Sequence, residues 1–143
     1  MYKDILVPVD LDHPEASEKA VGTACQMAKD YGAVLHFLSV VPPVSPLIAS
    51  YFPKNYRSSL SAAANERLHA FTAQYVRSDD IKRQHVIAHG SVYDEILQMR
   101  DQLNADLIIL TSHRPELKDY LLGPNTARIV RHAPCSVMVV REE

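Results

Sequence analysis

An aspartate stands directly after the first apolar run of the chain, where its carboxylate could bind a ligand. Asp10 follows Ile5-Leu6-Val7 and Pro8-Val9. A carboxylate at the end of a buried strand can accept hydrogen bonds from ribose hydroxyl groups or from the amine of adenine. An aspartate in this position is equally common as the capping residue of a turn or of the following helix. Position alone therefore supports both roles for Asp10.

A second candidate is the segment Gly123-Pro124-Asn125-Thr126, which opens a predicted helix. Glycine allows a phosphate to come close to the backbone, and the amides of Asn125 and Thr126 would face that phosphate from the helix N-terminus. Proline suits a first helical turn, because its missing N–H would be unpaired there. The alternative is an ordinary junction between a loop and a helix, since a single glycine is weak evidence for a phosphate site.

Common catalytic and metal-binding patterns are missing from the sequence. The chain has seven histidines, but none shows H-x3-H or H-E-x-x-H spacing on a helix. Neither a G-x-S-x-G nucleophile elbow nor a Walker A motif is present. The aspartate that a response-regulator receiver requires after its third strand is replaced by Ala88-His89-Gly90. We therefore expect no catalytic residues and no metal site.

The elements that would position these residues alternate between strands and helices. Short β-branched or leucine-rich runs without strict alternation are typical of strands buried on both faces of a parallel sheet. The predicted strands are 5–7, 34–41, 82–89, 106–111 and 136–140, of which 82–89 is patterned like an edge strand. Apolar stripes predict helices around 20–31, 60–75, 92–103 and 124–132. This order predicts one α/β domain over residues 1–143, built on a doubly wound, five-stranded, Rossmann-like parallel sheet.

Ligands of such sheets bind beyond the carboxyl ends of the strands. That rule selects four places, which are 8–10, 40–41, 111–114 and 123–126. One long irregular stretch, 42–56, follows the second strand and holds four of the nine prolines. Loops of this length are usually functional or mobile, and the alternative is a plain surface connection.

The composition limits the classes of partner. Lys plus Arg is 15 and Asp plus Glu is 17, and the formal net charge of −2 argues against a dedicated nucleic-acid surface. The apolar runs are far shorter than the ~20 residues of a membrane span, and the N-terminus does not resemble an export signal. Cys25 and Cys135 form no C-x-x-C pair, so we interpret both as reduced thiols. The expectation is a cytoplasmic protein with neither a nucleic-acid nor a membrane partner.

Four segments together resemble a known family. They are residues 5–10, 107–112, Leu121-Leu122-Gly123 and the C-terminal stretch 130–141. In these segments the chain is similar to the universal stress proteins, and Ser112-His113-Arg114-Pro115 resembles the F-type branch of the enterobacterial members. The resemblance implies the strand order 3-2-1-4-5, homodimers and, in many members, bound ATP without a robust catalytic cycle.

The resemblance also implies a set of cofactor-binding positions. The adenosine half would comprise Pro8, Val9, Asp10 and Val40, and the other positions are Leu110, Thr111, His113, Arg114, Gly123, Pro124, Asn125 and Thr126. The ATP-binding members carry G-x2-G-x9-G-[S/T], and this chain departs from that pattern. Thr111 and Arg114 replace two of the glycines, and only eight residues separate Arg114 from the third. Pro124 replaces the Ser or Thr. Arg114 can pair with phosphate oxygens, or it is a solvated surface arginine.

Three functions are open at this stage. The first is a regulatory or sensing module of the stress response that binds an adenine nucleotide, namely ATP with or without Mg2+, or ADP or AMP. The second is a homodimer that interacts with an unidentified protein and binds no nucleotide, which the departure at Pro124 favours. The third is a slow ATPase, for which no residue is clearly placed as a general base.

Overall fold

Five parallel strands form one sheet in the computed structural model, which describes residues 1–112 and 125–141. The strands are β1 (Asp4–Pro8), β2 (Val34–Val41), β3 (Arg83–His89), β4 (Leu107–Ser112) and β5 (Ser136–Arg141). Their order is β3-β2-β1-β4-β5, so the direction of winding reverses at β1 and β3 is an edge strand. The predicted fold class and strand order are therefore confirmed.

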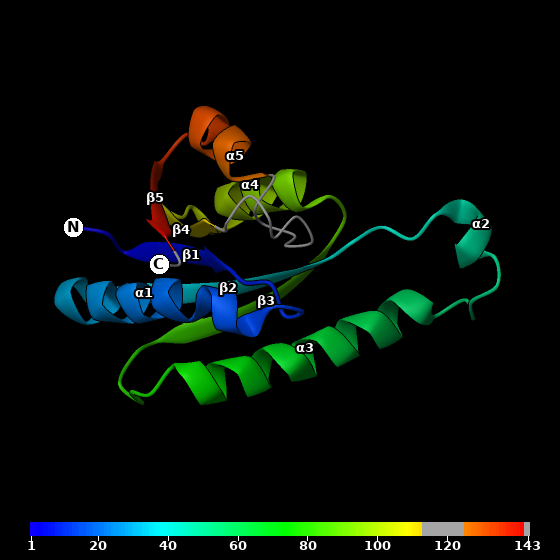
Figure 1. Ribbon diagram of the computed structural model, residues 1–143, viewed down its shortest axis with the longest axis horizontal. Coiled ribbons are helices and arrows are strands. Elements are labelled where there is room, and N and C mark those ends of the chain that lie inside the picture. The colour runs from blue at the N-terminus through cyan, green and yellow to red at the C-terminus, as the bar shows by residue number, and fades with distance from the viewer. Residues whose placement is uncertain (113–124, 142–143) are drawn as a thin grey trace.

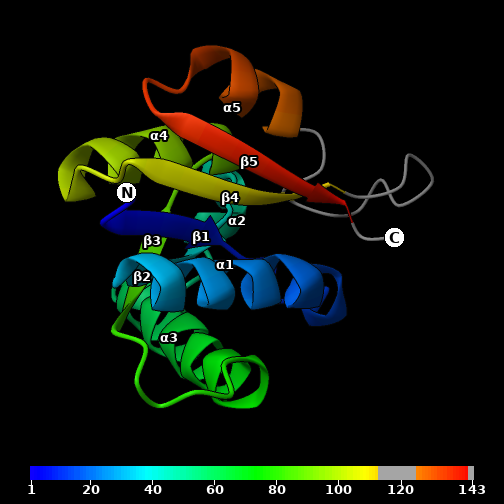
Figure 2. The ribbon, with the colours of Figure 1, turned by 90° about the vertical axis from the view of Figure 1, so that its left-hand side faces the viewer.

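Helices cover both faces of the sheet (Figures 1 and 2). A 3-10 turn, η1 (Pro14–Ser17), leads into α1 (Glu18–Tyr31), which shares its face with α3 (Tyr56–Tyr75). The other face carries α4 (Val92–Leu103) and α5 (Thr126–His132). Within the described residues, no helix is long and apolar enough to cross a lipid bilayer.

Each face of the sheet has its own apolar core, because the central strands are apolar on both sides. Phe37 points to the α1 and α3 side, where it joins Leu68 of α3. Its neighbour Leu38 points to the opposite side, where it joins Ile96 of α4. All four side chains are fully buried. The lack of alternation in the sequence of β2 is the consequence of this two-sided burial.

Two helix ends are set by local chemistry. Gly32 ends α1 at a φ of +67°, and its N–H donates to the carbonyl oxygen of Ala28, which makes it the C-cap of the helix. The hydroxyl of Ser91 accepts a hydrogen bond from the Asp94 N–H and so caps the start of α4. Gly90, just before it, has a φ of +147°, and a Cβ there would lie 2.8 Å from Oε2 of Glu95. This position requires glycine.

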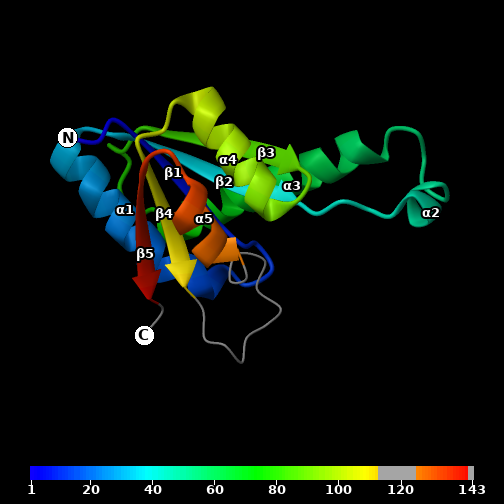
Figure 3. The same cartoon turned by 90° about the horizontal axis from the view of Figure 1, so that it is seen from above.

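The stretch between β2 and α3 contains a short helix that the sequence pattern does not predict. In α2 (Pro46–Ala49) the hydroxyl of Ser45 accepts a hydrogen bond from the Ile48 N–H, and Pro46 occupies the first turn. We call residues 42–57 the arm. Figures 1 and 3 show that the arm carries α2 far beyond the carboxyl end of the sheet, together with the start of α3.

Histidines hold α3 against β3. His85 Nε2 lies 2.8 Å from the hydroxyl oxygen of Thr72, and the His85 ring stacks on the His69 ring with centroids 3.7 Å apart. One turn from the start of the helix, Ser61 and His89 share a hydrogen bond. Burial lowers the pKa of His85, helped by the positive charges of His69 and Arg83. The packing of α3 on β3 therefore favours the neutral form of the His85 imidazole.

We expect the free energy of unfolding to decrease as the pH falls below the ordinary histidine pKa of 6.5. A histidine whose pKa is lowered by folding binds its proton more readily in the unfolded chain, so acid favours unfolding. Burial also lowers the pKa of His89, as does Arg57, and Glu95 opposes the effect. The measurement is urea denaturation at about pH 7.5 and about pH 5.5. His85→Gln should reduce the difference between the free energies of unfolding at the two pH values. An equal pH dependence in wild type and His85→Gln would contradict the assignment.

Candidate functional site

A cleft of about 160 Å³ lies at the carboxyl ends of β1 and β2, with α3 as its opposite wall. The strand side supplies residues from the end of β1 and the following turn, and from the end of β2. These residues are Val9, Asp10, Leu11, Asp12, Ser39, Val40, Val41 and Pro42, and α3 adds Leu60, Ala63, Ala64 and Arg67. Three of the four predicted adenosine-half positions, Val9, Asp10 and Val40, thus lie together along one cleft.

Asp10 is the buried acidic group of this cleft, with only 3% of its surface exposed. Its Oδ1 accepts a hydrogen bond of 3.0 Å from the Asp12 N–H, and its carbonyl oxygen accepts from the His13 N–H at 3.1 Å. Asp10 therefore has the turn-capping role that its position allows. The same turn holds the carboxylate at the wall of the cleft.

The α3 wall contains residues that the sequence analysis does not identify. Ala63 and Ala64 present only methyl groups to the cleft, which leaves room for a flat group between α3 and the strand ends. Arg67 reaches across one side, where its Nη2 donates to the carbonyl oxygen of Leu11 at 2.8 Å and to Oδ1 of Asp12 at 3.1 Å. The available signal is the helical spacing of Leu60, Ala63, Ala64 and Arg67, but it does not show which strand ends the helix faces.

The other predicted positions are distributed differently. Pro8 ends β1, and Leu110 is fully buried in the core beside α5. Asn125 and Thr126 stand at the start of α5, which begins two residues later than the sequence predicts. His113, Arg114, Gly123 and Pro124 lie outside the described residues.

Thr111, near the end of β4, has a buried hydroxyl group that could contact a ligand. Its side chain is buried, and its hydroxyl oxygen has no hydrogen-bond partner among the described residues. A buried hydroxyl without a partner costs roughly 1–3 kcal/mol, so such a group is uncommon unless another molecule satisfies it. The position is next to β1, at the point where the winding of the sheet reverses.

Comparison with known proteins gives the family. The model of the universal stress protein family matches residues 1–141. The chain belongs to the universal stress protein family. It is 36% identical to universal stress protein G of Escherichia coli O157:H7 over 144 residues, which covers 99% of this chain and all of the relative. Universal stress protein G of Salmonella typhimurium is 33% identical over the same length. The narrower F-type assignment stays a prediction.

Solved structures of universal stress proteins share the fold. Universal stress protein UspA from Lactobacillus plantarum superposes with a TM-score of 0.76 at 26% identity, covering 98% of both chains. A universal stress protein solved in complex with cAMP superposes with a TM-score of 0.61 at 22% identity, covering 99% of this chain and 98% of the other.

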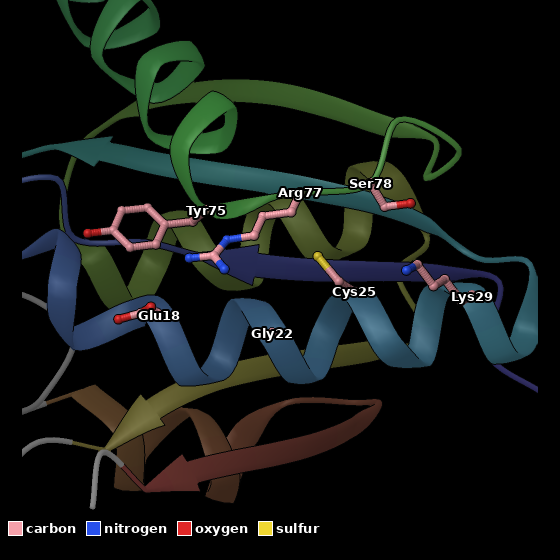
Figure 4. A pocket seen from close by; sticks show the side chains of 7 residues that line it. All are labelled: Glu18, Gly22, Cys25, Lys29, Tyr75, Arg77 and Ser78. Carbon is pink, nitrogen blue, oxygen red and sulfur yellow. The ribbon is translucent and has the colours of Figure 1, made fainter.

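A larger cleft of about 530 Å³ in this family member lies between α1 and the connection from α3 to β3 (Figure 4). It is lined by Glu18, Gly22, Cys25 and Lys29 of α1 and by Tyr75, Arg77 and Ser78 opposite. Burial raises the pKa of the Cys25 thiol, against the opposing effect of Arg83 and Lys29. No predicted site residue lies there, and the cleft is away from the carboxyl ends of the strands.

The described residues were also compared with the side-chain groups that bind metal ions in proteins. Across residues 1–112 and 125–141, the side chains of His, Cys, Asp and Glu form no group of three that could hold a metal ion.

Replacing Asp10 tests its role in the turn without any ligand. Asp10→Ala removes the acceptor of the Asp12 N–H and should lower the free energy of unfolding by about 1–2 kcal/mol. Asp10→Asn keeps a side-chain oxygen and should lose less. Asp12→Ala, which removes an exposed ion pair with Arg67, should cost under about 1 kcal/mol. Guanidinium denaturation measures all three, and equal losses for the Asn and Ala variants at position 10 would contradict the turn role.

Proposed function

We propose that this universal stress protein binds an adenine nucleotide, ATP in particular, in the cleft between β1, β2 and α3, and that it acts as a regulatory or sensing module in a stress response. The observation that carries the proposal is the convergence of Val9, Asp10 and Val40 opposite the alanine wall of α3. The relative solved with cAMP supports an adenine nucleotide as the ligand class.

The adenosine would be held by shape and by the Asp10 carboxylate. The purine ring would lie between the side chain of Val40 and the methyl groups of Ala63 and Ala64, because small side chains leave a slot for a flat ring. The carboxylate of Asp10 would accept hydrogen bonds from the ribose hydroxyls or from the adenine amine. A neighbouring cleft of about 230 Å³, which shares Pro42 and Leu60, offers space for the remainder of the nucleoside.

The phosphates would extend toward the carboxyl end of β4. There the hydroxyl of Thr111 has no partner among the described residues, and a phosphate oxygen would satisfy it. Asn125 and Thr126, at the start of α5, would contribute backbone N–H groups. Arg114 is proposed as a phosphate partner from the sequence. Mg2+ would accompany ATP through the phosphate oxygens, and ADP and AMP would use the same adenosine contacts.

Filling the slot in front of α3 should abolish nucleotide binding. Ala63 is exposed in the cleft, so Ala63→Trp should weaken ATP, ADP and AMP alike by at least about tenfold, which corresponds to about 1.4 kcal/mol. Ala62→Trp is the matched control, because Ala62 is the preceding exposed residue of α3 and is not part of the cleft wall. Isothermal titration calorimetry gives the dissociation constants. Wild-type protein that binds none of the three nucleotides would refute the proposal and favour the interaction dimer.

We also propose that the chain is a cytoplasmic homodimer joined through β5. This strand is at the edge of the sheet, and Val139 on it has 37% of its surface exposed. An apolar edge strand invites pairing with another chain, and a twofold contact between two copies of β5 would cover it. Cys25 and Cys135 are free thiols, which suits a reducing compartment.

Charge placed on β5 should separate the dimer. Val139→Lys would bury an ammonium group in the proposed contact and should shift the protein toward monomer. Val130→Lys is the control, because Val130 is 50% exposed on α5 instead of on the edge strand. Analytical ultracentrifugation at micromolar concentration measures the shift. A wild-type monomer at that concentration would rule out the assembly.

A further inference from the structure

We propose that the arm, residues 42–57, docks on the surface of an anionic lipid bilayer. Four large apolar side chains at its tip are exposed, namely Leu47 at 72%, Ile48 at 52%, Tyr51 at 82% and Phe52 at 42%. They make up half of the large apolar side chains that are exposed in the described chain. A cluster of this kind on a soluble surface usually marks a contact with another body.

Folding of the domain does not explain these side chains. None of the residues of α2 is buried, and the arm stands away from both cores in two views of the molecule (Figures 1 and 3). Pro42, Pro43, Pro46 and Pro53 restrict its backbone, so the apolar tip is presented on a stiffened support. Phe52 also packs on Tyr56 with ring centroids 5.3 Å apart, which ties the tip to the start of α3.

The charges of the arm indicate an acidic partner surface. No Asp or Glu occurs between Asp30 and Glu66, a stretch that includes the whole arm. The charged residues of the arm are Lys54 and Arg57, whereas the chain as a whole has a net charge of −2. Basic residues next to exposed aromatic and aliphatic side chains are the combination that binds the headgroup region of anionic membranes.

A bilayer fits the shape of the arm better than a protein partner does. The tip is a projection with apolar side chains around it, and a protein partner would need a matching apolar groove. The cleft of about 530 Å³ between α1 and the connection from α3 to β3 has Glu18, Lys29 and Arg77 in its wall, so it does not offer a second copy a purely apolar groove for the tip (Figure 4). Lipid needs no complementary shape, and it places aromatic rings at the interface and cations at the phosphates.

This contact is peripheral, so it is compatible with the finding that no described helix could cross a bilayer. It differs from the sequence-based expectation that the protein has no membrane partner, which rested in part on the shortness of the apolar runs. A few apolar side chains and two cations give weak, reversible binding that depends on salt and on anionic lipid. The proposal does not depend on nucleotide binding, because none of the four tip residues lines the nucleotide cleft.

The test uses the full chain and vesicles of two compositions. Because the sequence contains no Trp, Phe52→Trp introduces a single fluorescent reporter at the tip. We expect its emission to shift to the blue with vesicles of phosphatidylcholine and phosphatidylglycerol, and much less with phosphatidylcholine alone. The Ala62→Trp variant, with its reporter on the exposed face of α3, should not shift. No shift with either vesicle would overturn the proposal.

Co-sedimentation separates the apolar and the electrostatic contributions. Leu47→Ser/Tyr51→Ser should remove vesicle binding, whereas Val130→Ser at an exposed apolar site on α5 should retain it. Lys54→Glu/Arg57→Glu should weaken binding by on the order of tenfold or more. The control Lys19→Glu/Lys82→Glu makes the same change in net charge at exposed sites elsewhere and should have a much smaller effect. Equal effects of the two charge variants would overturn the proposal. It would also be overturned if the serine variant lost self-association while the wild type bound no vesicles, because the arm would then be an interface between copies of the chain.

Discussion

The parallel pairing of β1 with β2 determines where the candidate binding residues lie. The ladder runs from Asp4 beside Val34 to Pro8 beside Leu38. It continues for one more hydrogen bond, from the Val9 N–H to the carbonyl oxygen of Leu38 at 2.9 Å. The next residue is Asp10, and there the chain leaves the sheet in the turn that the Asp10 carboxylate caps. A slip of one residue in this ladder would move each β1 side chain to the opposite face, so the cleft requires this one register.

The length of α3 is the second constraint. A helix of 20 residues spans roughly 30 Å, whereas the seven residues of β3 span roughly 23 Å. The C-terminal end of α3 lies near the start of β3, because α3 leads into that strand. The helix is longer than the strand, so its N-terminal turns extend past the carboxyl ends of the strands. The extension supplies the wall of the cleft in its middle turns and the base of the arm at its start. The histidine contacts with β3 fix this position along the sheet.

Local sequence pattern was sufficient to predict the strands and the long helices, because burial on two faces and helical periodicity are properties of short segments. It predicted the buried stripe of α3, in which Leu68 and Phe71 are indeed buried. It did not identify Ala63 and Arg67, because both stand beside that stripe and look like solvent-facing residues. Their role depends on which strand ends α3 passes, which is a property of the assembled fold. The four-residue helix α2 was also missed, because one helical turn has no periodicity, although Ser45 and Pro46 form a start signal.

The cleft and the arm share structural elements, and this has a thermodynamic consequence. Pro42 and Leu60 line both the cleft between β1, β2 and α3 and the neighbouring cleft at the base of the arm. A ligand that fills the first cleft would therefore contact the two points from which the arm extends. Where binding at one place changes the preferred position of a shared element, the coupling free energy acts equally in both directions. If a bound nucleotide changed the affinity of the arm for a surface, the bound surface would change the affinity of the cleft for the nucleotide by the same factor. If both proposals hold, the length of α3 would connect the occupancy of the cleft with what the arm contacts.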